Sequence, residues 1–215
     1  ELPAEPEEVF EWITTPQNTN AIAIDEINFP DENFRNWALA QSWGADGYLS
    51  RSEIATITVI DIANMQISNL KGIEHFTALE ELYCYANQLK SLDISNNLAL
   101  EYLNCSGNQL TSLDVSNNLD LKELYCFSNQ LTELNVANNT ALTSLSCFNN
   151  QLTSLDVSTN LDLMNLDCNT NQLTLLDVSL NIVLSTLNCS NNFIPLDELP
   201  AEPEEVFEWI TTPQN

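Results

Sequence analysis

Residues 101–121 read EYLNCSGNQLTSLDVSNNLDL, and residues 122–142 repeat the pattern as KELYCFSNQLTELNVANNTAL. The two cysteines, Cys105 and Cys126, are 21 residues apart, and the same 21-residue spacing holds along most of the chain. A disulfide framework is not spaced in this way, whereas a structural repeat is. We therefore predict a solenoid, in which each coil buries its apolar side against its neighbours. The period is marked by six cysteines, which are Cys84, Cys105, Cys126, Cys147, Cys168 and Cys189.

Each unit follows LxxLxCxxNQLxxLDVSxNxx and contains two short segments in which apolar residues alternate, LxC and LDV. Alternation over a few residues indicates a strand with one buried face. Copies of the same strand in successive coils then pair in parallel, about 4.8 Å apart. Leucine and cysteine are expected to point inward, which makes the cysteines a column of reduced, buried thiols. The asparagine after each LxC strand is expected to bond the backbone of the turn.

The repeat pattern resembles that of bacterial leucine-rich-repeat proteins, especially a 21-residue class with a strand on both sides of the coil. The resemblance covers about residues 57–193, with cysteine where many relatives carry leucine. It implies a leucine-rich-repeat solenoid, mainly parallel β, wound as a right-handed superhelix. We accordingly expect a second parallel strand at the LDV segment.

Residues 19–56 are predicted to form a short helical cap in front of the repeats. The stretch INFPDENFRNWALAQ (27–41) opens with proline and acids, then shows helical spacing through Phe34, Trp37 and Leu39. A cap of this kind would cover the exposed apolar end of the first coil.

The next stretch, GADGYLSRSEI (44–54), resembles the second half of a calcium loop. Four residues fall at EF-hand spacings, but Ser42 and Gly44 would be poor ligands at the first and third positions. We therefore predict no bound metal and no cofactor. Together the two stretches look like the EF-hand-like cap of internalins, which are bacterial surface adhesins. The residues at EF-hand spacings are Asp46, Gly47, Leu49 and Glu53.

Both ends of the chain carry the same segment. ELPAEPEEVFEWITTPQN occupies residues 1–18 and again residues 198–215. We interpret residues 1–18 as the linker or cap of a preceding unit in a tandem array, and residues 194–215 as an acidic C-terminal cap. Phe207 and Trp209 are expected to pack on the last coil, as a short helix or strand. The first copy would then be loose or dock on a neighbouring molecule, giving end-to-end self-association; an engineered duplication is the alternative.

The charge of the chain excludes some partners. It has 31 acidic and 5 basic residues, a formal net charge of −26, and the basic residues form no cluster. A nucleic-acid binder needs lysine and arginine to replace phosphate counterions, so we expect no nucleic acid. No apolar run approaches the roughly 18 residues of a membrane helix, so we expect no membrane insertion.

Catalysis is not indicated, and we predict that the chain is not an enzyme. His75 is the only histidine, and no motif places a nucleophile beside it. The LDV segments carry a row of aspartates that is either a weak cation-binding face or a set of turn caps. That row consists of Asp93, Asp114, Asp156 and Asp177.

The outward positions of the LxC strands offer a candidate binding surface. Six aromatic residues crowd the first four coils: Tyr83, Tyr85, Tyr102, Tyr125, Phe127 and Phe148. Exposed aromatic clusters rimmed by acids are typical of binding sites, although aromatics also stack on sheets for stability alone. We expect a protein or glycan ligand here and, from the resemblance, an extracellular or cell-surface adhesion module. The alternative is a structural spacer or stalk unit.

Overall fold

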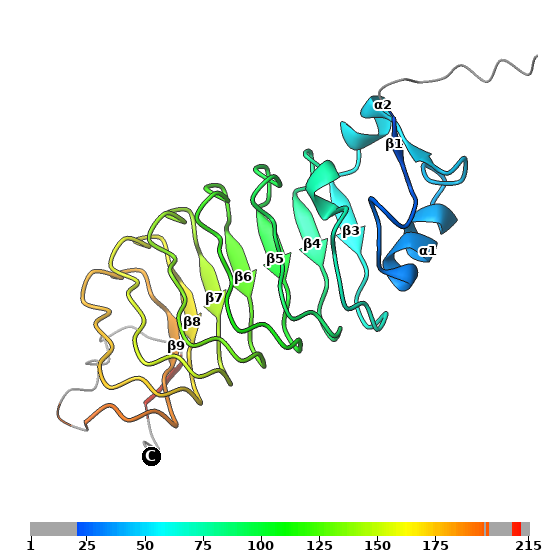
Figure 1. Ribbon diagram of the computed structural model, residues 1–215. Helices are drawn as coiled ribbons and strands as arrows, with labels where there is room; N and C mark the ends of the chain where they lie inside the picture. The colour runs from blue at the N-terminus through cyan, green and yellow to red at the C-terminus, as the bar shows by residue number, and fades with distance from the viewer. Residues whose placement is uncertain (1–20, 196, 198–207, 212–215) are drawn as a thin grey trace, which may run out of the picture.

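The computed structural model describes residues 21–195, 197 and 208–211, which form an elongated solenoid with a cap at its N-terminal end (Figure 1). One sheet of eight strands runs along the solenoid in the order β10-β9-β8-β7-β6-β5-β4-β3. The predicted fold class, a leucine-rich-repeat solenoid built mainly from parallel strands, is confirmed. The strands are β3 (Val59–Asp61), β4 (Glu81–Tyr83), β5 (Tyr102–Asn104), β6 (Glu123–Tyr125), β7 (Ser144–Ser146), β8 (Asn165–Asp167), β9 (Thr186–Asn188) and β10 (Glu208–Ile210).

Each strand pairs in parallel with the equivalent residues of its neighbour. Leu82 faces Leu103, and Leu103 faces Leu124, because every coil has the same length. These leucines are buried, as are the cysteines two residues further on. A side-chain period of two turns the residues between them to the outer face of the sheet.

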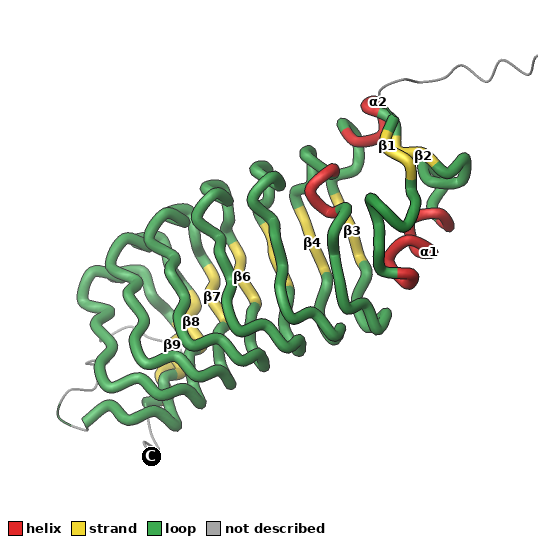
Figure 2. Tube along the Cα trace, in the orientation of Figure 1, coloured by secondary structure: helices red, strands yellow, loops and turns green. Residues whose placement is uncertain are grey.

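The predicted second strand is wrong. Leu92 and Ile94 are buried while Asp93 is exposed, so the expected alternation is present. The described part of the chain has no strand there, however, and Figure 2 shows that side of the coils as loop, apart from one helical turn in the first coil. The backbone N–H of Ser95 donates to the Asp93 carboxylate at 3.0 Å. This side-chain turn bends the chain before a ladder can form.

The asparagine after each LxC strand ties its coil to the coil before it. The Asn129 side-chain amide donates to the carbonyls of Cys105 and Cys126, both at 3.1 Å, and its oxygen accepts from the N–H of Leu110 at 3.0 Å. Backbone groups at a turn have no ladder partner, and burying them unpaired costs free energy. The asparagine therefore satisfies the turn, as the sequence predicts.

A second asparagine series works on the opposite side of the coil. Asn139 is fully buried, and its side-chain amide donates to the carbonyls of Val115 and Asn118 at 2.9 and 2.8 Å. Its Oδ1 accepts no hydrogen bond from the described residues. In this series the asparagine therefore acts as a donor that bridges two coils.

The cap consists of α1 (Glu32–Ala40), α2 (Arg51–Ile54) and the antiparallel pair β1 (Ile22–Ala23) and β2 (Tyr48–Leu49). A single 3-10 turn, η1 (Ile73–His75), lies in the first coil. One carboxylate joins cap to solenoid. Asp31 caps α1 through the N–H groups of Asn33 and Phe34, and its other oxygen accepts from the N–H of Ser68 at 2.8 Å. Cap and solenoid also share one continuous apolar core.

The face of α1 that packs on the solenoid differs in part from the prediction. Phe34 and Ala38 are fully buried and Trp37 is partly buried against the core, whereas Leu39 is 36% exposed. Residues four apart share a helix face, which pairs Phe34 with Ala38. Gly44 packs against the backbone carbonyl of Ala38, where an added Cβ would lie only 2.0 Å from the oxygen, so position 44 does not accommodate a side chain.

Replacement of Asn129 by alanine should lower the free energy of unfolding by roughly 2 kcal/mol or more. The change leaves the buried N–H of Leu110 unpaired, which costs about 1–3 kcal/mol, and removes one of the two asparagine hydrogen bonds at each carbonyl of Cys105 and Cys126. Urea unfolding followed by circular dichroism measures the loss. Asn138→Ala is the matched control, since exposed Asn138 makes one hydrogen bond, to Ser116. Equal unfolding midpoints for the two variants would contradict the ladder's role.

Candidate functional site

The outward side chains of β4 to β9 form one regular surface, which we call the strand face. Three tyrosines stack across its first three strands. The ring centroids of Tyr83 and Tyr102 are 4.7 Å apart, and those of Tyr102 and Tyr125 are 5.5 Å apart. In the register of the sheet, Tyr102 lies two residues earlier along its strand than Tyr83 and Tyr125 do along theirs, so its ring lies diagonally between them.

Two glutamates hold this stack. In the register of the sheet, Tyr102 lies between Glu81 and Glu123. The Tyr83 hydroxyl donates to Glu81, and the Tyr125 hydroxyl donates to Glu123, each at 2.8 Å. The hydrogen bond to Glu81 raises the pKa of Tyr83 to about 12, because a phenolate beside a carboxylate is unfavourable. The rings are therefore oriented by packing and by hydrogen bonds together.

A second aromatic pair lies two residues further along the strands. The rings of Phe127 and Phe148 stack with centroids 4.4 Å apart and planes 8° apart. Tyr85 is the most exposed of the six aromatics, at 38%. The structure thus brings five of the six predicted residues into two stacks and places Tyr85 on the same face. We call all six the aromatic patch.

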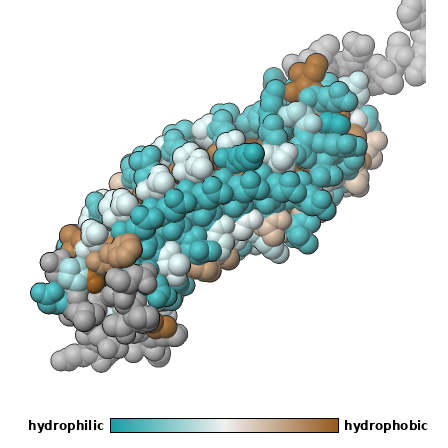
Figure 3. Space-filling model, turned by 60° about the horizontal axis from the view of Figure 1, so that its bottom comes forward, coloured by the Kyte–Doolittle hydropathy of each residue, from teal (hydrophilic) through white to brown (hydrophobic). Residues whose placement is uncertain are grey.

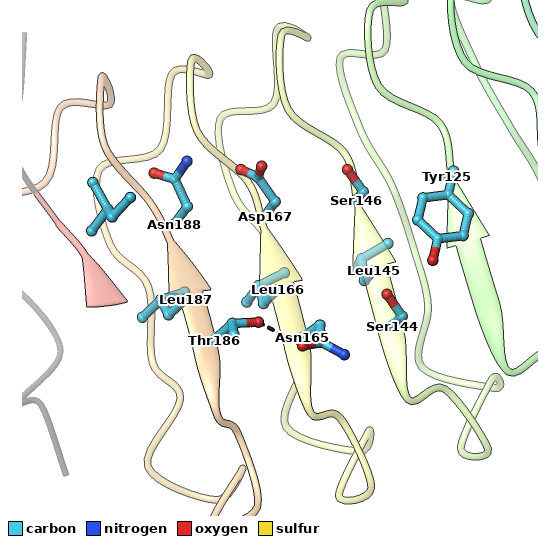
Figure 4. A pocket seen from close by; sticks show the side chains of 11 residues that line it. Tyr125, Ser144, Leu145, Ser146, Asn165, Leu166, Asp167, Thr186, Leu187 and Asn188 are labelled. Atoms are coloured by element: carbon cyan, nitrogen blue, oxygen red, sulfur yellow. Dashed lines mark hydrogen bonds between the residues drawn. The ribbon is translucent and has the colours of Figure 1, made fainter. Parts of the chain in front are cut away.

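Beyond Tyr125 the strand face is hollow. A depression of about 350 Å³ lies over β7, β8 and β9, between the Tyr125 ring and Ile210 (Figure 4). Its floor carries short polar side chains, among which Thr186 donates to Asn165 at 2.6 Å. The sequence analysis did not find this hollow. The signal was present, because Ser144 and Ser146 occupy the columns that carry bulky rings in the coils before.

The strand face is acidic. The outward residues of β4 to β9 include no lysine or arginine, and Glu81, Glu123 and Asp167 all lie among them. Asp61, on the neighbouring β3, adds a further carboxylate beside the face. Just outside the face, Lys122 is held by Glu101 at 2.6 Å. Figure 3 shows a largely hydrophilic band along another side of the solenoid.

The aspartate row of the LDV segments is explained by turn capping. Like Asp93, Asp114 and Asp156 accept a hydrogen bond from the backbone N–H two residues on, at 2.9 Å each. Hydrogen bonds from the capped serine lower the pKa of each carboxyl group. Among the described residues there is no group of three or more histidine, cysteine or acidic side chains that could hold a metal.

The calcium-loop resemblance is accounted for in part by local hydrogen bonds. Glu53 accepts from the N–H of Ser50 at 2.7 Å and forms a capping box at the start of α2. Asp46 accepts from the N–H of Tyr48, and Gly47 has the positive φ of +81° that a tight loop requires. The absence of calcium from this loop stays a prediction.

The cysteine column is buried, as predicted. All six cysteines have 0% exposure, and those from Cys84 to Cys168 are free thiols. Burial raises the pKa of Cys105 and of Cys147 to about 12. A thiol with such a pKa carries almost no thiolate at neutral pH, so the column fills the core rather than reacting.

No helix within the described ranges is long and apolar enough to span a membrane.

The buried cysteine column should make the native protein inert to a thiol reagent at pH 8. That pH is far below the raised pKa of the thiols, and the reagent cannot reach the core. After denaturation without reductant, at least the five thiols from Cys84 to Cys168 should react. Thr111→Cys, at an exposed position, is the control and should add one fast-reacting thiol to the native protein. Fewer than about four reactive thiols in the denatured wild type would mean that disulfides form.

No known family model matches the chain, but individual relatives do. Internalin J of Listeria monocytogenes is 43% identical over 70 residues, which is 32% of this chain and 8% of internalin J. The solved functional domain of InlJ from the same species, described as including a cysteine ladder, has a TM-score of 0.77 and 41% identity. That likeness covers 81% of this chain and 39% of the solved one.

Two further structures extend the comparison. A leucine-rich-repeat protein of Leptospira interrogans has a TM-score of 0.64 and 27% identity, over 70% of this chain and 42% of that one. Internalin C2 of Listeria monocytogenes, at 20% identity and a TM-score of 0.62, covers 89% of this chain and 98% of its own, and shares the fold.

The chain spans less than half the length of the internalin J sequences and of the Leptospira structure that it matches. Within that span the similarity to internalin J includes the feature that is least expected of a leucine-rich repeat, the buried column of cysteines. This chain is a leucine-rich-repeat solenoid whose repeats are similar to those of internalin J.

Proposed function

We propose that the chain is an extracellular or cell-surface module for protein interaction or adhesion, and that the aromatic patch contacts the partner. Its leucine-rich-repeat relatives are interaction modules rather than enzymes. The observation that carries the proposal is the pair of ring stacks on the strand face, held outside the core.

The stacks suit binding because their geometry is set before a partner arrives. Aromatic side chains offer a large contact area and few rotatable bonds, so little entropy is lost on association. Here the Tyr102 ring is fixed between Tyr83 and Tyr125, and both outer hydroxyls are anchored on glutamates. A partner would meet an ordered surface.

The charge of the strand face favours a protein partner with a basic surface. Carboxylates of Glu81 and Glu123 lie beside aromatic rings, and lysine and arginine bind such mixed surfaces through ion pairs and cation–π contacts. The polar hollow over β7 to β9 offers further acceptors, including Asp167. A glycan, which would also stack on rings and bond the polar side chains, is the other outcome that a binding screen distinguishes.

A second candidate function is a spacer or stalk unit in a tandem array. The observation that favours it is the pairing of β10, from the terminal segment, with the last coil. That segment is repeated at the start of the chain, as a junction between identical units would be. An engineered duplication would give the same sequence, and the flanking gene sequence would decide between the two.

Tyr83→Ala combined with Phe127→Ala should weaken partner binding about 30-fold, since truncated interface aromatics cost roughly 2 kcal/mol or more. The melting temperature should change little, because both side chains lie outside the core. Binding is measured against an array of extracellular proteins and glycans, first to find ligands of the wild type and then to compare variants.

Tyr48→Ala is the matched control for that experiment. Tyr48 is a tyrosine of the cap and is 53% exposed, so its loss should leave binding unchanged. If the double variant binds every wild-type ligand with undiminished affinity, the aromatic patch is not the contact surface and the spacer function is favoured.

A further inference from the structure

The last strand of the sheet comes from the terminal segment. β10 pairs in parallel with β9, with Glu208 facing Thr186, Trp209 facing Leu187 and Ile210 facing Asn188. The N–H of Cys189 donates to the Ile210 carbonyl at 2.9 Å. This pairing continues the register of the repeats, so the segment extends the solenoid by one strand. The predicted packing of Phe207 and of the Trp209 side chain lies outside the described residues.

The chain holds a second copy of that strand. Residues 11–13 have the sequence of residues 208–210, and the identity extends over the whole of 1–18 and 198–215. An identical sequence presents the same donors and acceptors in the same order. Each chain therefore carries two strand donors for each β9 edge.

The last coils expose more apolar surface than those before them. The coil before β9 carries Leu175, Leu180 and Val183 where the preceding coil carries Ser154, Thr159 and Asp162. All three apolar residues are at least 46% exposed. Figure 3 shows apolar residues gathered at the C-terminal end. This surface favours a contact at the C-terminal end of the solenoid.

We propose that the terminal segment is an exchangeable strand, and that residues 11–13 of one chain pair with β9 of a second chain in the register of β10. The chain from Ile13 to Ile22, at the start of β1, spans at most about 30 Å. The cap of the donor must therefore lie within about 30 Å of the last coil of the acceptor. The contact joins unlike ends, so it gives open chains of molecules wherever the rotation between neighbours does not close a ring.

The two copies compete for the same edge. The C-terminal copy is tethered to its own β9, at an effective concentration on the order of millimolar. A copy from another molecule makes the same contacts without that advantage, so the full chain keeps its own strand at ordinary concentrations. In a tandem array the same segment would sit between two units and couple each cap to the preceding last coil.

The same substitution at the two equivalent positions tests the proposal. Ile210→Pro removes an N–H from the C-terminal strand, and proline is not tolerated inside a ladder. The full-length I210P chain should form particles of two or more chains as its concentration rises, measured by light scattering after size exclusion. Wild type and I13P should stay single chains, and the double variant I13P/I210P should return to one chain.

A synthetic peptide with the sequence of residues 198–215 adds an independent measurement. In excess it should return the mass of I210P particles to one chain, whereas the same peptide with proline in place of the isoleucine should not. Circular dichroism reports whether I210P is folded. If I210P is unfolded, the proposal is tested instead by whether the labelled peptide exchanges into the wild-type chain. The proline peptide is the control.

Three outcomes would overturn the proposal. They are a folded I210P that stays a single chain up to about 1 mM, an association that survives in I13P/I210P, and equal retention of the two peptides by the wild-type chain. None of them bears on the ligand of the aromatic patch.

Discussion

The hydrogen bonds that each asparagine sends into the coil before it are the interaction on which the solenoid depends. A coil cannot keep its whole backbone in a ladder, because it must turn between its straight sides. At one turn, Asn129 serves one N–H and two carbonyls that the strands leave unpaired. Repeated in every coil, this side chain fixes where the chain turns and so fixes the coil length. Equal length is what keeps the strands in register.

Register in turn makes every side chain meet its own equivalents. In the core, leucine stacks on leucine and cysteine on cysteine, and neither side chain requires a hydrogen-bond partner. On the outer surface of the solenoid it has different consequences for different residues. Aromatic rings gain from close neighbours and form the stacks of Tyr102 with Tyr83 and Tyr125. The aspartates of the LDV segments would repel one another, but each is engaged by the backbone of its own turn.

Features that follow from the repeat spacing could be predicted from the sequence. Features that depend on contacts between distant residues, or on the local path of the backbone, could not. The strands at Leu82 and its copies, the buried thiols and the asparagine bonds all followed from spacing. The second strand did not form, because an alternation such as Leu92 and Ile94 requires burial of one side but not a ladder. The hydrogen bond from Ser68 to Asp31 joins residues 37 apart in the chain, and no sequence pattern predicts it. The hollow over β7 to β9 arises from the absence of bulky side chains, which a search for distinctive residues overlooks.

The backward direction of the asparagine bonds gives the solenoid unequal ends. Asn108 serves the coil of Cys84, and Asn192 serves the coil of Cys168, so each coil is secured by its successor. Position 213, where the next asparagine of the series would fall, is a proline. An asparagine of this series therefore cannot serve the final coil from position 213, whereas the first coil is covered by a folded cap. We expect the solenoid to unfold from its C-terminal end toward the cap, one coil at a time.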